Sequence, residues 1–199
     1  MTRLNRQLLS VLLVILGIIF FEMTRPVGQP PGILAPDPPS VQTVVDKPPV
    51  FTRDNHAIEG LAQFKAKARV LSLERYGRDP QARIAPLDVA LGWDKLSDST
   101  TFKGVDVAQA ERQVVFESYN PELPNELVAT MVVNLHVIGA DGEVDKKLRD
   151  VRRGNVVQIE GWLVEVRAQE GWRWKGQARA ASPAMPGNVL WVQNVEVVQ

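Results

Sequence analysis

The chain of 199 residues carries 23 basic and 23 acidic side chains, 14 prolines and no cysteine. The lack of cysteine excludes disulfide bonds, thiolate zinc sites and a cysteine nucleophile. Nucleic-acid binding depends on a concentrated excess of Lys and Arg, which this balance of charge does not provide, so we expect no nucleic-acid partner.

An apolar run at the start of the chain predicts where the remainder works. Residues 8–21 contain no charged side chain, and Arg3 and Arg6 precede them. We expect residues 8–23 to be a signal-anchor transmembrane helix, with residues 1–7 in the cytoplasm and the remainder exported, because basic flanks stay inside. The expected location is a bacterial inner membrane, crossed once, with a periplasmic or extracytoplasmic domain.

A cleaved signal peptide is the alternative interpretation of this run. Fourteen helical residues cover about 21 Å, which is less than a hydrocarbon core of about 30 Å. However, Phe21-Glu22-Met23-Thr24 follows without the small-x-small pattern of a cleavage site. Under both interpretations, the remainder of the chain is expected to be exported.

Residues 24–54 are predicted to be a proline-rich linker. Proline fixes φ and lacks an amide donor, so this stretch should be extended and partly polyproline II. At about 3.1 Å per residue, such a spacer could hold a domain several tens of ångströms from the membrane. The prolines concerned are Pro26, Pro30, Pro31, Pro36, Pro38, Pro39, Pro48 and Pro49.

An exported β domain is expected at residues 55–199. Alternating polar and apolar residues predict a strand at residues 64–73, and strands are also predicted at 113–119 and 127–138. The strand at 127–138 is rich in Val and Met and should therefore be central in the sheet.

Two short helices are predicted between the strands. Residues 88–91 should form one or two helical turns that end at Gly92. Residues 141–151 should form the other helix, capped by Asp141. Its apolar residues share one side and are Val144, Leu148 and Val151.

The final third of the chain has the clearest β pattern. Residues 156–167 predict a long strand whose apolar phase shifts at Gly161, which indicates a bulge or bend there. Residues 172–178 should be its hairpin partner, and 189–198 a last strand. Long strands bent at glycine are typical of small barrels, so we predict a mainly β, antiparallel, OB-like small barrel with one or two short helices.

Several motifs resemble a family of uncharacterised bacterial envelope proteins. They are Ala68-Arg69-Val70-Leu71-Ser72, residues 85–98 with Leu91-Gly92-Trp93 and Ser97-Asp98, residues 134–138, residues 151–157, residues 160–166 and Gly171-Trp172-Arg173-Trp174. The resemblance covers about residues 64–193 and implies an envelope location without implying an activity. Members of that family carry proline where this chain has Gly139, and an aromatic, histidine-bearing stretch ahead of Tyr119.

Catalytic candidates are few. His136 could serve in acid–base catalysis because histidine titrates near neutral pH, although a hydrogen-bonded structural histidine is the simpler interpretation. Asp88, Asp94 and Asp98 could supply a carboxylate pair as in sugar hydrolysis, although aspartate in such loops commonly caps turns. No metal site and no cofactor are expected, since no ligand set has suitable spacing.

Trp172, Arg173 and Trp174 are the candidate ligand-binding residues. On a strand, the two rings share one face and Arg173 lies on the other. Such aromatics could stack on sugar rings or bases, or could equally form core and cross-strand pairs. We therefore expect a membrane-tethered envelope domain that binds a protein or a glycan. The alternative is an envelope hydrolase that uses His136 or the Asp88–Asp98 region.

Overall fold

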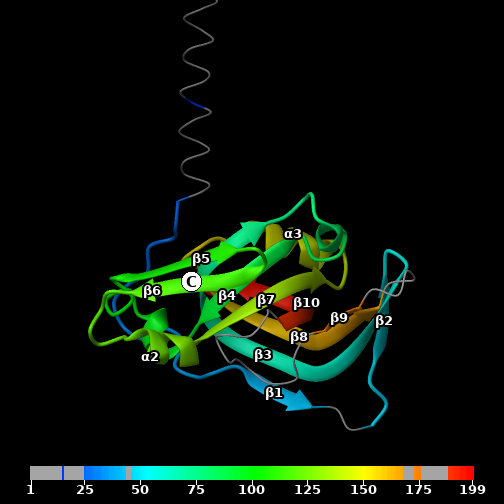
Figure 1. Cartoon of the computed structure of the whole chain (residues 1–199), viewed down its shortest axis with the longest axis horizontal. Coiled ribbons are helices and arrows are strands. Elements are labelled where there is room, and N and C mark those ends of the chain that lie inside the picture. The colour runs from blue at the N-terminus through cyan, green and yellow to red at the C-terminus, as the bar shows by residue number, and fades with distance from the viewer. Residues whose placement is uncertain (1–14, 16–24, 44–45, 168–172, 176–187) are drawn as a thin grey trace, which may run out of the picture.

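The computed structural model describes residue 15 and residues 25–43, 46–167, 173–175 and 188–199. This part of the chain is mainly β, with a mixed sheet, a separate hairpin and two short α-helices (Figure 1). The strands of the sheet are β1 (Ser40–Thr43), β2 (Val50–Arg53), β3 (His56–Arg75), β4 (Leu87–Gly92), β7 (Val132–Gly139), β8 (Val156–Arg167), β9 (Arg173–Lys175) and β10 (Asn188–Val197). The hairpin is β5 (Val105–Ala110) with β6 (Gln113–Ser118), the α-helices are α2 (Asn125–Thr130) and α3 (Gly142–Asp150), and the 3-10 turns are η1 (Pro80–Arg83) and η2 (Asp94–Ser97).

The long strand β3 organises the sheet. Its residues 57–69 pair with β8 along one edge, and its residues 69–75 pair with β4. Its first half also pairs with β2 and β1. From Phe64 to Val70 its buried residues alternate with Lys65 and Lys67, which are exposed, as expected for a strand with one face toward a core.

The pairings form a series that returns to β3. β3 pairs with β4, β4 with β7, β7 with β10, β10 with β8, and β8 again with β3. Four of these pairs are antiparallel and β7 and β10 are parallel, so the sheet is mixed and the predicted antiparallel arrangement holds for most of its pairs. β7 and β8 run in opposite directions, because each step from β7 to β4, β3 and β8 is antiparallel. β10 is antiparallel to β8 and therefore runs parallel to β7.

The core lies on the inner face of this series. Leu71, Leu91, Leu135, Leu163 and Leu190 are among its fully buried side chains. A second apolar cluster includes Ile58, Ile138 and Trp191 and receives the rings of Phe51, Trp162 and Trp174.

Two predicted secondary-structure elements differ from the structure. Residues 87–92 form strand β4 and not a helix, with Leu87, Val89 and Leu91 in the core and Asp88 on the other face. Every residue of β4 is buried, so the polar–apolar alternation that identifies a half-exposed strand is weak. Residues 127–130 belong to α2, and the predicted central strand begins only at Val132.

The second predicted helix is confirmed as α3. Oδ1 of Asp141 accepts hydrogen bonds from the amides of Glu143 and Val144, both at 2.9 Å. Val144 and Leu148 are buried against the sheet.

The irregularity predicted at Gly161 lies in the two strands that pair with β8 and not in β8 itself. β3 carries one extra residue between Gly60 and Ala62, and β10 carries one between Val192 and Asn194, while Gly161 itself is regularly paired. A Cβ atom at Gly161 would collide with the carbonyl oxygen of Trp191. The glycine is therefore required because the backbone of β10 approaches closely.

The proline-rich stretch lies against the domain and is not a free spacer. Ser97 Oγ accepts hydrogen bonds from the amides of Leu34 and Ala35, both at 3.1 Å, and Ala35 is fully buried. Further on, β1 and β2 join the sheet by pairing with β3. The residues between prolines retain amide donors, and these donors bond to the domain.

Candidate functional site

The structure brings two of the predicted catalytic residues together. Asp88 on β4 and His136 on β7 are register partners on the outer face of the sheet. Nδ1 of His136 lies 2.8 Å from Oδ1 of Asp88, with side-chain exposures of 3% and 0%. The ring is not aligned for a directed hydrogen bond at this distance. The pair is thus close enough for chemistry, but neither side chain faces solvent.

Arg112, which sequence reasoning missed, covers this pair. Its Nη1 donates to Oδ1 of Asp88 at 2.8 Å and to the carbonyl oxygen of Ala85 at 2.9 Å. Its Nη2 donates to both carboxylate oxygens of Asp79, at 2.7 and 3.0 Å. The guanidinium also lies 3.8 Å from the ring centre of Tyr76. Arg112 therefore joins the loop before β4 to the sheet.

The backbone at Arg112 explains how the side chain reaches Asp88. Ala110 and Gln113 are register partners, so Glu111 and Arg112 form a two-residue hairpin turn. Both have positive φ, +50° and +66°, as type I′ turns require. Asn and Gly are favoured there and Arg is not, so the ion pairs offset an unfavourable backbone conformation. The carbonyl oxygen of Arg112 also accepts a hydrogen bond from Nδ2 of Asn134 at 3.0 Å.

Trp174 closes the cluster from another element. It lies on β9, and its ring centre is 4.6 Å from that of His136 and 5.6 Å from the Arg112 guanidinium. Arg173 is exposed, with Nη1 4.0 Å from a carboxylate oxygen of Glu165. Trp172 lies outside the described residues, so a shared binding surface of Trp172, Arg173 and Trp174 stays a prediction.

Asp94 and Asp98 are not part of this cluster. Asp94 begins η2, and its amide donates to the carbonyl oxygen of Ala35 at 2.7 Å. Oδ1 of Asp98 accepts from the amides of Thr100 at 2.8 Å and Gly32 at 3.0 Å. These bonds hold the pKa of Asp98 below its usual value, with the Thr100 amide as the main cause. Both residues organise turns, so they do not form a carboxylate pair with Asp88.

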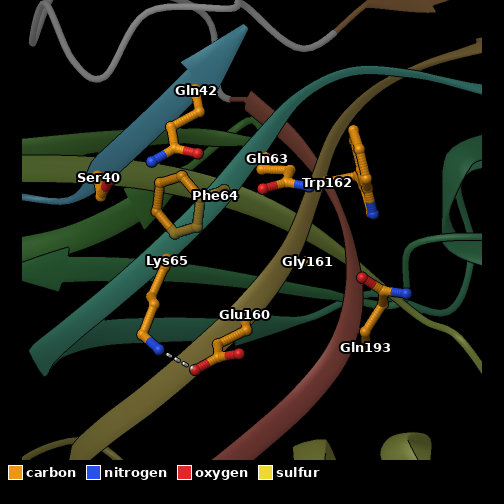
Figure 2. A pocket seen from close by; sticks show the side chains of 9 residues that line it. All are labelled: Ser40, Gln42, Gln63, Phe64, Lys65, Glu160, Gly161, Trp162 and Gln193. Carbon is orange, nitrogen blue, oxygen red and sulfur yellow. Dashed lines mark ion pairs between the residues drawn. The ribbon is translucent and has the colours of Figure 1, made fainter. Parts of the chain in front are cut away.

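A separate open pocket lies beside Gly161 and the β10 bulge (Figure 2). Its volume is about 400 Å³. Gln63 and Trp162 are register partners on β3 and β8 and stand side by side in it (Figure 2). Gln193 is the extra residue of the β10 bulge. The lining is completed by Ser40, Gln42, Phe64, Lys65, Glu160 and Gly161.

The pocket combines an aromatic face with polar groups. Trp162 is half-buried, and its ring centre lies 6.5 Å from that of Phe51, which itself stacks on Trp191 at 4.9 Å. Gln42, Gln63 and Gln193 are exposed and offer amide donors and acceptors. Lys65 and Glu160 form an ion pair at 2.7 Å at its edge. Phe64, only 2% exposed, underlies the pocket.

Comparison with known proteins adds no assignment, since no family model, curated protein or solved structure matches this chain. None of the helices in the described part of the chain has the length and apolar character needed to cross a membrane. The predicted anchor at residues 8–23 lies outside that part, apart from Ile15.

Proposed function

We propose that this protein is a membrane-tethered, exported domain that binds a glycan of the cell envelope in the pocket beside Gly161. The observation that carries the proposal is the placement of the Trp162 ring next to the amides of Gln63 and Gln193. An indole offers an apolar face for a sugar ring. A side-chain amide can both donate hydrogen bonds to sugar hydroxyl groups and accept them. The compartment follows from the apolar run at residues 8–23 and the arginines before it.

We further propose that the five strands that return to β3 form an OB-like barrel. Support comes from the parallel pairing of β7 with β10 and from α3, which connects β7 to β8. Barrels of this kind bind oligosaccharides and oligonucleotides on one face. Residues 1–25 contain three arginines and one glutamate, so the rest of this neutral chain carries a net charge of −2, which favours a glycan over a nucleic acid.

A glycan also fits the surface better than a protein partner does. The large apolar side chains exposed among the described residues are scattered over β2, β6 and the C-terminal end, for example Val50, Val115 and Val197. Protein-binding surfaces usually present a contiguous apolar patch. The pocket instead offers one aromatic ring surrounded by polar groups.

Calorimetry of the full chain in mild detergent with soluble peptidoglycan fragments and neutral oligosaccharides tests this proposal. We expect Trp162→Ala to weaken binding at least about tenfold, because a central aromatic contact is commonly worth 2 kcal/mol or more. Tyr119→Ala, which removes an aromatic residue that is 65% exposed just after β6 and outside the pocket lining, is the matched control and should bind normally. Gln63→Ala with Gln193→Ala should also weaken binding, without affecting folding, since both side chains are exposed. Equal affinities in all variants, or no binding to any saccharide, would overturn the proposal.

A hydrolase is the second candidate, because His136 and Asp88 are 2.8 Å apart. A histidine oriented by a carboxylate is a common general base. Burial of both groups beneath Arg112 and Trp174 argues against this role. Chromatography of the oligosaccharides after incubation separates the two functions. Cleavage products released by the wild-type chain and not by His136→Gln would establish the hydrolase instead.

A further inference from the structure

The domain is held at a fixed place close to the predicted anchor. The amide of Val27 donates to the carbonyl oxygen of Arg153 at 2.7 Å, and Nε2 of Gln29 donates to the carbonyl oxygen of Gly154 at 2.9 Å. Gly154 has φ +91°, and a Cβ atom there would collide with the carbonyl oxygen of Val27. The chain is therefore attached to the domain from residue 27 onward.

The remaining tether is very short. If residues 8–23 span the bilayer, only residues 24–26 separate the anchor from Val27. Three residues reach at most about 10 Å, because an extended residue covers about 3.3–3.6 Å. The face of the domain around Val27 and Arg153 must then lie at the membrane surface. This step rests on the anchor of the proposed function.

That face is basic. Arg25 and Arg152 line a cavity of about 510 Å³ together with residues 26–28. Arg152 and Arg153 also line an adjoining groove of about 910 Å³, which extends to Arg149 and Arg75. Two carboxylates, Glu74 and Asp150, line the same groove. Nη2 of Arg75 donates hydrogen bonds to the carbonyl oxygens of Arg149 and Val151 at the end of α3.

A buried guanidinium near Arg153 is only partly compensated. Arg69 is only 9% exposed, and within the described part of the chain its Nε and Nη1 atoms have no hydrogen-bond partner. Burial lowers its pKa, and the positive charge of Arg153 lowers that pKa further, while Asp98 acts in the opposite direction. The guanidinium rests on the ring of Phe102 at 4.9 Å. An anion bound near Arg153 would relieve this unfavourable concentration of positive charge.

We propose that the face formed by Arg25, Arg149, Arg152 and Arg153 binds the phosphate headgroups of anionic phospholipids in the membrane that holds the anchor. Each basic residue close to an anionic bilayer favours binding by about fivefold. Arginine also pairs with phosphate oxygens in a bidentate manner. The domain would thus have one preferred orientation on the membrane, with this face toward the lipid.

The test compares lipid retention by the full chain and two charge-matched variants. Each protein is exchanged into mixed micelles of phosphatidylcholine and phosphatidylglycerol, and retained lipids are counted by native mass spectrometry. Arg152→Gln with Arg153→Gln removes two charges from the basic face. Arg173→Gln with Lys175→Gln removes two charges at the opposite end of β8, where β9 pairs with residues 165–167.

We expect the wild type and the β9 variant to retain phosphatidylglycerol in preference to phosphatidylcholine. The Arg152/Arg153 variant should lose this preference by about tenfold or more. Equal preference in all three proteins, or none in any, would overturn the inference. Alkaline extraction of membranes separates this failure from failure of the anchor. A chain released by alkali is not anchored, whereas a retained chain without lipid preference contradicts only the headgroup site.

Discussion

At the scale of single residues, Arg112 connects three segments that are separate in the sequence. Its guanidinium bonds to Asp79 before η1 and to Asp88 on β4, while its own backbone forms the turn between β5 and β6. Asp88 is 0% exposed, and Oδ2 of Asp88 has no hydrogen-bond partner among the described residues. A carboxylate buried in this way depends on its remaining partners, so the cluster is sensitive to the loss of any one of them.

We therefore expect Arg112→Ala to lower the free energy of unfolding by about 3–5 kcal/mol, because it leaves the Asp88 carboxylate buried without its cation. Denaturant unfolding followed by tryptophan fluorescence measures the change. Arg83→Ala is the control, since Arg83 is an exposed arginine in the loop before β4, and it should change stability by less than about 0.5 kcal/mol. If Arg112→Ala costs no more than this control, the ion pairs contribute little to the fold.

At the scale of the elements, the sequence predicts helices and strands whose apolar residues recur at helical or strand spacing. Helix α3 was predicted because Val144 and Leu148 repeat at helical spacing after the capping Asp141. Strand β8 was predicted from the alternation of its apolar residues, with Val157 and Ile159 on one face before Gly161 and Val164 and Val166 on one face after Trp162. Strand β4 was missed because the β5–β6 side covers its outer face through Arg112, which removes the alternation of polar and apolar residues.

The candidate site was predictable in part. His136 and Asp88 stood out by residue type, but their pairing depends on the register of β4 with β7, which no local pattern encodes. Arg112 gave no signal because its role depends on a turn in which Glu111 and Arg112 replace the usual Asn and Gly. The pocket beside Trp162 includes Gln193, the extra residue of the β10 bulge, which no glycine marks in the sequence.

The close approach at Gly161 makes a separate prediction for β8 and β10. Gly161→Ala should destabilise the protein by about 1–3 kcal/mol, because the added Cβ meets the backbone of Trp191 and not a side chain that can rotate away. It should also weaken saccharide binding, since Gly161 lines the pocket. Gly28→Ala is the matched control, because nothing lies within 4 Å of a Cβ at Gly28. Thermal unfolding and calorimetry measure both effects, and a fully stable Gly161→Ala protein would show that the strands can separate at little cost.

At the scale of the whole molecule, the described N-terminal segment packs along the domain. Residues 25–43 follow the domain from the turn at Arg153 to β3: Val27 bonds to Arg153, Ala35 to Asp94 at the start of η2, and Ser40 pairs with β3. The pocket beside Trp162 includes Ser40 and Gln42 of this same segment, so the stretch that would hold the domain near the proposed anchor also forms one wall of the pocket.

A longer tether should therefore weaken the contact with lipid and leave saccharide binding unchanged. We consider a flexible Gly/Ser insertion of about 20 residues between Thr24 and Arg25, whose root-mean-square length is about 25 Å. This average distance exceeds the Debye length of about 8 Å at physiological ionic strength, so the domain spends most of its time beyond the reach of the lipid charge. The preference for phosphatidylglycerol should fall toward that of the Arg152/Arg153 variant, while thermal stability and saccharide affinity stay at wild-type values because Arg25 onward is unchanged. An insertion that leaves the preference intact would mean that the basic face binds headgroups strongly enough without the short tether, and that proximity to the anchor is not its cause.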